Sequence, residues 1–275
     1  MGFSDFINIL RPLNCIMAAF GTFIGYCIAS GYLVQFDFWI GIAMAVAFLV
    51  CAGGMVVNDF FDRAVDKKLH PEKPIPSGRI AAKTALLYAG FLFFSGNLLA
   101  FKFLPGISFA IALAFTALLI LYSMFLSKAK FIGNFVVASG TAFTLIFGAS
   151  LLGNYAIVAW LAFAALLANL ARELIKDLQD MEADKGHKKS LPMLMSGTTV
   201  NAIIFIYYLG AIAAVYVPAF FLSFNGAGFV AIASIANLLF LYSFALALKK
   251  KFGKAQLFSK IAMLIALIGF LFGVV

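Results

Sequence analysis

Long apolar segments alternate with short polar connections along this chain. The apolar segments occupy residues 13–34, 38–57, 84–103, 107–126, 131–152, 155–171, 200–222, 228–248 and 257–275. Each is close to the roughly 20 residues that a helix needs to cross a bilayer. The apolar runs are continuous and do not alternate with polar residues, which favours helices over the strands of a membrane barrel. The sequence therefore predicts an all-α polytopic membrane protein with nine transmembrane helices.

Composition agrees with this fold class. Hydrophobic residues make up 64% of the 275 residues and charged residues only 11%, whereas soluble domains carry about a quarter charged residues. The first segment has no basic start and no cleavage site of small residues, so we expect it to remain as the first helix. Cys15, Cys27 and Cys51 lie inside apolar segments without a CxxC pattern, which predicts buried thiols, not disulfides or metal ligands.

The basic residues predict the orientation in the membrane. With nine spans, only Lys102 of the 20 Lys and Arg residues falls on the side opposite the N-terminus. This asymmetry places the N-terminus and the long polar segments in the cytoplasm. The net charge of +9 is then explained by topology and by anionic lipid, so we expect no nucleic-acid partner.

Two long polar segments, residues 58–83 and 172–199, contain nine of the eleven acidic residues. In both, three aspartates are spaced by three and then four residues: Asp59, Asp62 and Asp66 in the first, Asp177, Asp180 and Asp184 in the second. On a helix such positions share one face. The segments follow the second and sixth spans, so both lie on the same side of the membrane.

A weak internal repeat accounts for this similarity. Each acidic stretch is followed by basic residues and then by Pro with Ser-Gly, in "EKPIPSG" and "KKSLPMLMSG". We interpret residues 1–275 as one domain in which spans one to four and five to eight repeat, with the ninth span added.

Stacked carboxylates repel one another, so their charge must be offset. Nearby Lys and Arg residues on an ordinary solvated surface would do this. The alternative is Mg²⁺, which binds one or two carboxylates together with the phosphate oxygens of a substrate. A metal-bound diphosphate at the mouth of an apolar bundle predicts a substrate with a long hydrocarbon tail, as in polyprenyl diphosphates.

These motifs resemble those of the UbiA-type intramembrane prenyltransferase superfamily. Asn58, Asp59, Asp62 and Asp66 match its N-D-x-x-D-x-x-x-D motif, and Asp177, Asp180 and Asp184 match D-x-x-D-x-x-x-D. "KPIPSG" (73–78) and "RPLN" (11–14) are similar to two further family motifs. The resemblance implies nine helices around a central cavity, cytoplasmic cap helices from the two long segments, and transfer of a prenyl group from its diphosphate.

Residue roles follow from the resemblance as hypotheses. Asp62, Asp66, Asp180 and Asp184 are expected to bind Mg²⁺, with Asn58, Asp59 and Asp177 completing the site. The residues expected to bind the diphosphate or the prenyl group are Arg11, Asn14, Arg63, Lys73, Tyr122, Lys128 and Lys176. Tyr122 and Lys128 depart from the Y-x-x-x-K spacing of many family members. Asn97, Asn134 and Asn237 are expected to join helices, and Asn134 is the exception that could serve the site.

The acceptor is less constrained by the sequence. Within the family, the motifs are most similar to the archaeal branch, which transfers a geranylgeranyl group to the hydroxyl of geranylgeranylglyceryl phosphate in ether-lipid synthesis. An aromatic acid or quinone precursor is the alternative acceptor. A cation transporter is disfavoured, because it would place ionisable residues near the middle of the membrane.

Overall fold

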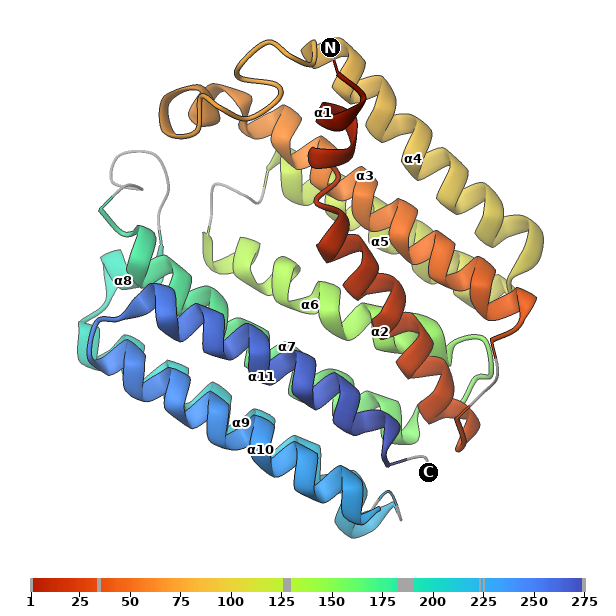
Figure 1. The fold of residues 1–275 in the computed structure, drawn as a ribbon, viewed down its shortest axis with the longest axis vertical. Helices are drawn as coiled ribbons and strands as arrows, with labels where there is room; N and C mark the ends of the chain where they lie inside the picture. The colour runs from red at the N-terminus through yellow and green to blue at the C-terminus, as the bar shows by residue number, and fades with distance from the viewer. Residues whose placement is uncertain are drawn as a thin grey trace. The chain divides into compact units, whose positions relative to one another are not determined.

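The computed structural model describes residues 2–33, 36–125, 130–182, 190–222, 224 and 226–273, and within these ranges the regular structure is helical (Figure 1). The helices are α1 (Phe3–Asn8), α2 (Pro12–Ser30), α3 (Phe38–Leu69), α4 (Ala82–Phe103), α5 (Gly106–Met124), α6 (Lys130–Ala149), α7 (Ala156–Asp180), α8 (Leu191–Leu194), α9 (Gly197–Phe221), α10 (Ala227–Leu248) and α11 (Phe252–Leu271). Among the described residues, nine helices are long and apolar enough to cross a membrane, all except α1 and α8. The predicted number of spans is confirmed.

Two of the nine helices extend well beyond their apolar segments. Helix α3 has 32 residues, about 48 Å at 1.5 Å per residue, which exceeds the roughly 30 Å of bilayer hydrocarbon. Its last turns carry the first acidic motif. Lys67 and Lys68 lie in the final turn, where positive charges interact favourably with the helix dipole. Helix α7 likewise continues to Asp180. The residues of the first motif, 58–66, thus form the end of a transmembrane helix.

The chain divides into two compact units. The first comprises Met1–Phe23 with Phe36–Ser127, and the second comprises Ile24–Gln35 with Lys128–Val275. The boundary near residue 127 separates α5 from α6, while the last part of α2 belongs to the second unit. The internal repeat stays a prediction.

In the first unit, α3 packs against both α4 and α5. Adjacent glycines of α3 allow both approaches. A Cβ at Gly53 would lie 2.8 Å from the Phe93 ring of α4, and a Cβ at Gly54 would lie 2.8 Å from Leu119 of α5. Small residues are the usual means by which membrane helices approach closely.

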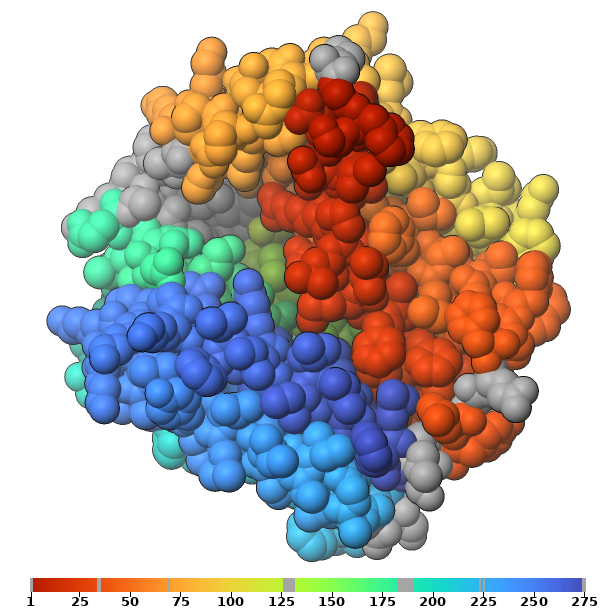
Figure 2. All heavy atoms as spheres, in the orientation of Figure 1, coloured from red at the N-terminus to blue at the C-terminus, as the bar shows by residue number. Residues whose placement is uncertain are grey.

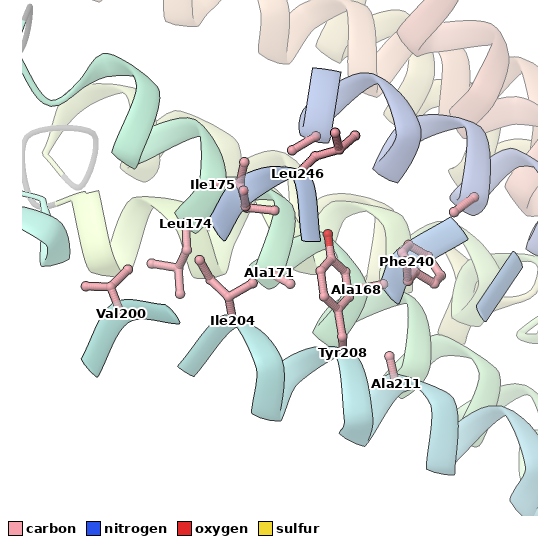
Figure 3. Packing of buried hydrophobic residues seen from close by; sticks show 13 residues of the cluster. Ala168, Ala171, Leu174, Ile175, Val200, Ile204, Tyr208, Ala211, Phe240 and Leu246 are labelled. Atoms are coloured by element: carbon pink, nitrogen blue, oxygen red, sulfur yellow. The ribbon is translucent and has the colours of Figure 1, made fainter. Parts of the chain in front are cut away.

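In the second unit, α7 packs against α6, α9 and α11, and α10 packs against α9 and α11. Ala171, Leu174 and Ile175 of α7 meet Ile204 and other apolar residues of α9 in a buried cluster (Figure 3). Helices α10 and α11 are packed neighbours. When all atoms are drawn as spheres, their side chains fill the space between the two helices (Figure 2). The core of this unit is therefore centred on α7, the helix that carries the second acidic motif.

One buried hydroxyl network joins the three C-terminal spans. The Tyr208 hydroxyl of α9 lies 3.2 Å from Ser243 Oγ of α10 and 3.2 Å from Ser259 Oγ of α11. Ser243 Oγ also donates to the carbonyl oxygen of Ala255 at 2.8 Å. In contrast, large side chains such as Phe91 and Leu238 are exposed, as expected where helices face lipid.

We predict that Gly25→Ala destabilises the second unit. A Cβ at Gly25 of α2 would fall on the backbone carbonyl of Leu145 in α6, and overpacking of this kind costs about 1–3 kcal/mol or more. The midpoint of thermal unfolding in detergent should fall. Gly90→Ala in α4 is the matched control, because nothing lies within 4 Å of its Cβ. Equal midpoints for the two variants would contradict the close contact.

Candidate active site

The first acidic motif turns its carboxylates toward the protein. Asp59 and Asp66 are only 4% and 6% exposed, and Asp62 on the same helix face is half-buried. Burying an ionised carboxylate is costly unless an opposite charge and hydrogen bonds compensate it. The contacts of this motif therefore determine what the site can bind.

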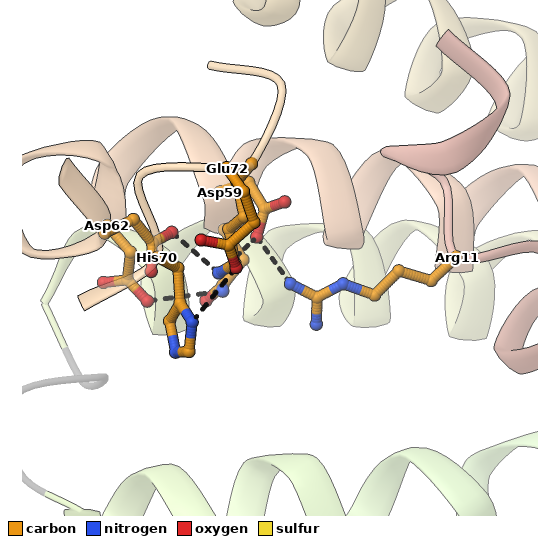
Figure 4. A network of polar contacts seen from close by, with 8 residues as sticks. Arg11, Asp59, Asp62, His70 and Glu72 are labelled. Atoms are coloured by element: carbon orange, nitrogen blue, oxygen red, sulfur yellow. Dashed lines mark hydrogen bonds and ion pairs between the residues drawn. The ribbon is translucent and has the colours of Figure 1, made fainter. Parts of the chain in front are cut away.

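Two cations from other parts of the first unit supply that compensation. Arg11 extends from the start of α2 toward Asp59, and its Nη2 donates to Asp59 Oδ1 at 2.6 Å (Figure 4). Lys73, in the turns after α3, donates from Nζ to Asp66 Oδ2 at 2.8 Å and lies 3.7 Å from Asp59 Oδ1. Both residues were predicted to bind phosphate oxygens. The structure brings them to the carboxylates of the motif, within reach of any anion that binds there.

Asn58 adds an amide to this site. Its Nδ2 donates to Asp62 Oδ2 at 3.4 Å. Its Oδ1 is buried and has no hydrogen-bond partner among the described residues, an arrangement that costs free energy unless a ligand satisfies the oxygen. An amide oxygen beside a carboxylate is a donor pair that suits Mg²⁺.

The described residues do not form a complete metal site by themselves. No group of three or more His, Cys, Asp or Glu side chains within them is arranged to hold a metal ion. Mg²⁺ usually keeps several waters and shares the phosphate oxygens of a substrate. The donors at Asn58 and Asp62 fit this kind of binding, in which substrate and water complete the coordination.

Other predicted residues of the first unit have different surroundings. Arg63 is exposed; its guanidinium lies 4.4 Å from the centre of the Phe60 ring and donates to the Phe60 carbonyl oxygen at 2.7 Å. Asn14 is exposed, and Tyr122 is half-buried near the end of α5. Roles for Arg63, Asn14 and Tyr122 in substrate binding stay predictions.

Helix α1, which the sequence did not predict, is held to the turns after α3 by Arg79. Arg79 donates from Nε to Asp5 Oδ1 at 2.8 Å and from Nη2 to the carbonyl oxygen of Glu72 at 2.7 Å. It thus joins α1 to the turns that carry Lys73. Arg11 itself has φ of 52°, a left-handed conformation that is uncommon outside glycine and often marks functional sites. Arg79 directly follows "KPIPSG", and that position is the signal that could have identified it.

The Asp5–Arg79 contact also perturbs a titration. The hydrogen bond from Arg79 lowers the pKa of Asp5 below its ordinary value of 3.8, with burial acting in the opposite direction. A carboxylate with a depressed pKa stabilises the folded arrangement above its unfolded pKa. That contribution is lost as the pH falls through the folded value, below 3.8.

The second acidic motif lies at the end of α7 and uses a different partner. Asp177 is 1% exposed, and its Oδ2 accepts a hydrogen bond of 2.7 Å from Asn134 Nδ2 of α6. Asp180, three residues later, is half-buried. Asp184 and Lys128 lie outside the described residues.

A buried acidic residue that sequence reasoning missed precedes this motif. Glu173 is 4% exposed; it is paired with Arg172 and lies 4.0 Å from Nζ of Lys176. Lys176, which was predicted to bind phosphate, therefore lies beside the carboxylate of Glu173. Glu173 is about one helical turn before the motif. Glu173 is four residues before Asp177, and this spacing on one helix face was the signal available.

This chain is similar to known proteins over nearly its full length. The model of the UbiA prenyltransferase family matches residues 18–268. A digeranylgeranylglyceryl phosphate synthase from Thermococcus kodakarensis is 36% identical, covering 98% of each chain. One from Methanosarcina mazei is 35% identical and covers 99% of each.

Solved structures show the same fold. A structure described as giving insight into digeranylgeranylglyceryl phosphate synthase in membranes has a TM-score of 0.83 at 32% identity, covering 98% of each chain. A UbiA homologue from Archaeoglobus fulgidus bound to GPP and Mg²⁺ has a TM-score of 0.70 at 16% identity, again covering 98% of each.

We predict that Lys73→Ala lowers the free energy of unfolding by about 1–3 kcal/mol, because Asp66 then loses its cation and Asp59 keeps only Arg11. Lys67→Ala, at an exposed position of α3, is the matched control and should change stability by about 0.5 kcal/mol or less. Denaturation in mixed micelles measures both. Equal effects for the two variants would show that Lys73 does not compensate the buried carboxylates.

The depressed pKa of Asp5 predicts a local transition at low pH. A nitroxide attached at Ser4→Cys should be immobile at neutral pH and become mobile as the pH falls below 3.8. Adding Asp5→Asn should leave the label mobile already at neutral pH. A nitroxide at Lys102→Cys reports global unfolding, and a transition shared by both labels would rule out a local release of α1.

Proposed function

This chain belongs to the UbiA prenyltransferase family, and we propose that it transfers a geranylgeranyl group from its diphosphate to the hydroxyl of geranylgeranylglyceryl phosphate. It is an intramembrane prenyltransferase. The choice of substrates is supported by the similarity to digeranylgeranylglyceryl phosphate synthases across nearly the whole chain. The product would be the second ether bond of an archaeal lipid.

The observation that carries this proposal is the acidic face at the end of α3. An apolar membrane span leads directly into Asp59, Asp62 and Asp66, and the cations Arg11 and Lys73 already lie beside them. A prenyl diphosphate has the matching form, with a hydrocarbon tail and an anionic head. When the head group binds, Arg11 and Lys73 can exchange a carboxylate for a phosphate oxygen through charge-assisted hydrogen bonds.

Mg²⁺ is the cofactor of the proposed reaction. Asn58 and Asp62 would hold it in the first unit, with Asp59 and Asp66 beside them. For the second motif the proposal depends on sequence spacing, which makes Asp180 and Asp184 ligands as well. The bound ion would neutralise the diphosphate and make it a better leaving group. The UbiA homologue bound to GPP and Mg²⁺ supports this choice of ion.

The chain's own residues would do the remaining work. Arg11 and Lys73 would stabilise the charge that develops on the departing diphosphate. Arg63, Lys128 and Lys176 are proposed as further phosphate contacts, with Asn14 beside them. Tyr122 is proposed to face the allylic carbon as its positive charge develops. The basic residues also support an orientation with both acidic motifs in the cytoplasm.

A direct assay tests the substrates. Purified protein with Mg²⁺ and geranylgeranyl diphosphate should prenylate geranylgeranylglyceryl phosphate, and mass spectrometry should detect the second ether. A parallel incubation contains 4-hydroxybenzoate, the representative aromatic acceptor. Transfer to the aromatic acid alone would overturn the proposed acceptor and leave the prenyltransferase assignment in place.

Removing one charge from either motif should abolish turnover. Asp62→Asn and Asp180→Asn should each lower kcat by about a hundredfold or more, as expected when stabilisation of a departing anion is lost. Glu72→Gln is the matched control, because it removes a carboxylate that is 72% exposed in the turns that follow α3. Circular dichroism verifies folding. Full activity in both aspartate variants would reject the metal-diphosphate site.

A further inference from the structure

Polar side chains join α6 and α7 along one seam of the second unit. Asn134 Nδ2 donates to Asp177 Oδ2 at 2.7 Å, and Asn169 Nδ2 donates to Thr141 Oγ1 at 3.0 Å. The two contacts are seven residues apart on α6 and eight apart on α7. This is the spacing of antiparallel neighbours, about two helical turns or roughly 11 Å along the axes.

The contact between Asn134 and Asp177 is more deeply buried than the amide–carboxylate contact of the first motif, in which Asn58 and Asp62 are both half-buried. Asp59 and Asp66 are paired with the cations Arg11 and Lys73, which can turn to another anion. Asp177 is 1% exposed, and Asn134, whose amide donates to it, is 7% exposed. Because both partners are almost inaccessible, we expect this contact to persist when substrate binds.

The contact between Asn134 and Asp177 lies where it can fix the end of α7. Asp177 lies in the last turn of α7, where the backbone carbonyls have no partners within the helix and the end tends to fray. A hydrogen bond from α6 fixes both the rotation and the register of this turn. Asp180 is three residues further on the same face, so fixing Asp177 also fixes the direction in which Asp180 points.

We propose that Asn134 and Asp177 form a positioning pair, in which Asp177 acts as a hydrogen-bond acceptor and not as a metal ligand. The pair holds the end of α7 so that Asp180 is presented to the metal-diphosphate complex. This rests on the proposed function for the role of Asp180. It removes Asp177 from the ligand set expected from the motif and adds Asn134, an amide from another helix, to the residues that determine metal affinity.

Exchanging the two side chains tests the pair. Asn and Asp have the same shape, so the double variant Asn134→Asp with Asp177→Asn keeps one amide and one carboxylate in contact. Asn134→Asp alone sets two carboxylates against each other and should weaken metal binding about tenfold, within the range of measured pair couplings. Asp177→Asn alone should weaken it less. The double exchange should restore binding to within about threefold of the wild type.

The readout is metal affinity, measured apart from turnover. Electron paramagnetic resonance measures Mn²⁺ binding to the purified protein with geranylgeranyl S-thiolodiphosphate, an unreactive analogue of the donor, and scales it to folded protein. Thr141→Val is the matched control, because it removes the other polar contact of the same seam. It should lower the unfolding midpoint and leave Mn²⁺ affinity unchanged.

Each outcome decides the proposal. Loss of Mn²⁺ binding in Asp177→Asn without recovery in the double exchange would make Asp177 a ligand. Unchanged affinity with reduced stability in Asn134→Asp would make the contact purely structural. Either result overturns the pair even if the wild type forms the ether product. Conversely, recovery in the double exchange by a protein that does not prenylate geranylgeranylglyceryl phosphate would support the pair and reject only the proposed acceptor.

Discussion

Buried carboxylates at the end of α3 need cations, and the chain brings those cations from two separate places. Arg11 precedes α2, and Lys73 follows α3. In a low-dielectric setting, an uncompensated carboxylate would ionise with difficulty and destabilise the helix that carries it. The contacts around this site therefore have a clear physical role. Arg79 joins α1 to the turns that contain Lys73, and Arg11 adopts its unusual backbone conformation between α1 and α2.

The length of α3 places the carboxylates of the first motif beyond the hydrocarbon of the membrane. Because α3 is a single helix of 32 residues, its apolar part can span the hydrocarbon while its last turns carry the acidic motif beyond it. Gly53 and Gly54 let α4 and α5 approach the apolar part closely. A rigid continuous helix fixes the carboxylates relative to the membrane more firmly than a flexible loop would.

The two acidic motifs share a spacing, and the described contacts of their aspartates differ. Asp59 and Asp66 contact cations and Asp62 accepts a hydrogen bond from Asn58, whereas Asp177 accepts one from the buried amide of Asn134. A cation that contacts a carboxylate can leave it and bind an incoming phosphate. Asn134 and Asp177, in contrast, are both buried. Equivalent places in a sequence motif can thus have different surroundings once helices pack around them. The similarity to digeranylgeranylglyceryl phosphate synthases is a similarity of whole chains and does not assign these roles residue by residue.

Sequence alone determined the helical membrane fold, the nine spans and the two acidic motifs. These depend on local properties, namely the length of apolar runs and the three- and four-residue spacing of Asp59, Asp62 and Asp66. It also singled out Arg11 and Lys73, because they lie in family-like motifs; the structure places both beside the first acidic motif, and their binding of phosphate stays a prediction. It did not reveal that α3 continues through the motif, since hydropathy falls at Asn58 although the backbone stays helical.

Tertiary structure alone decided the partners. Nothing near Asp177 in the sequence indicates Asn134, which is 43 residues away, and nothing near Asp5 indicates Arg79, 74 residues away. Hydrogen bonds and ion pairs act over about 3 Å, so they depend on which helices become neighbours. That choice is made by packing, through features such as the glycines of α3 and the apolar face of α7, and no local pattern in the sequence encodes it.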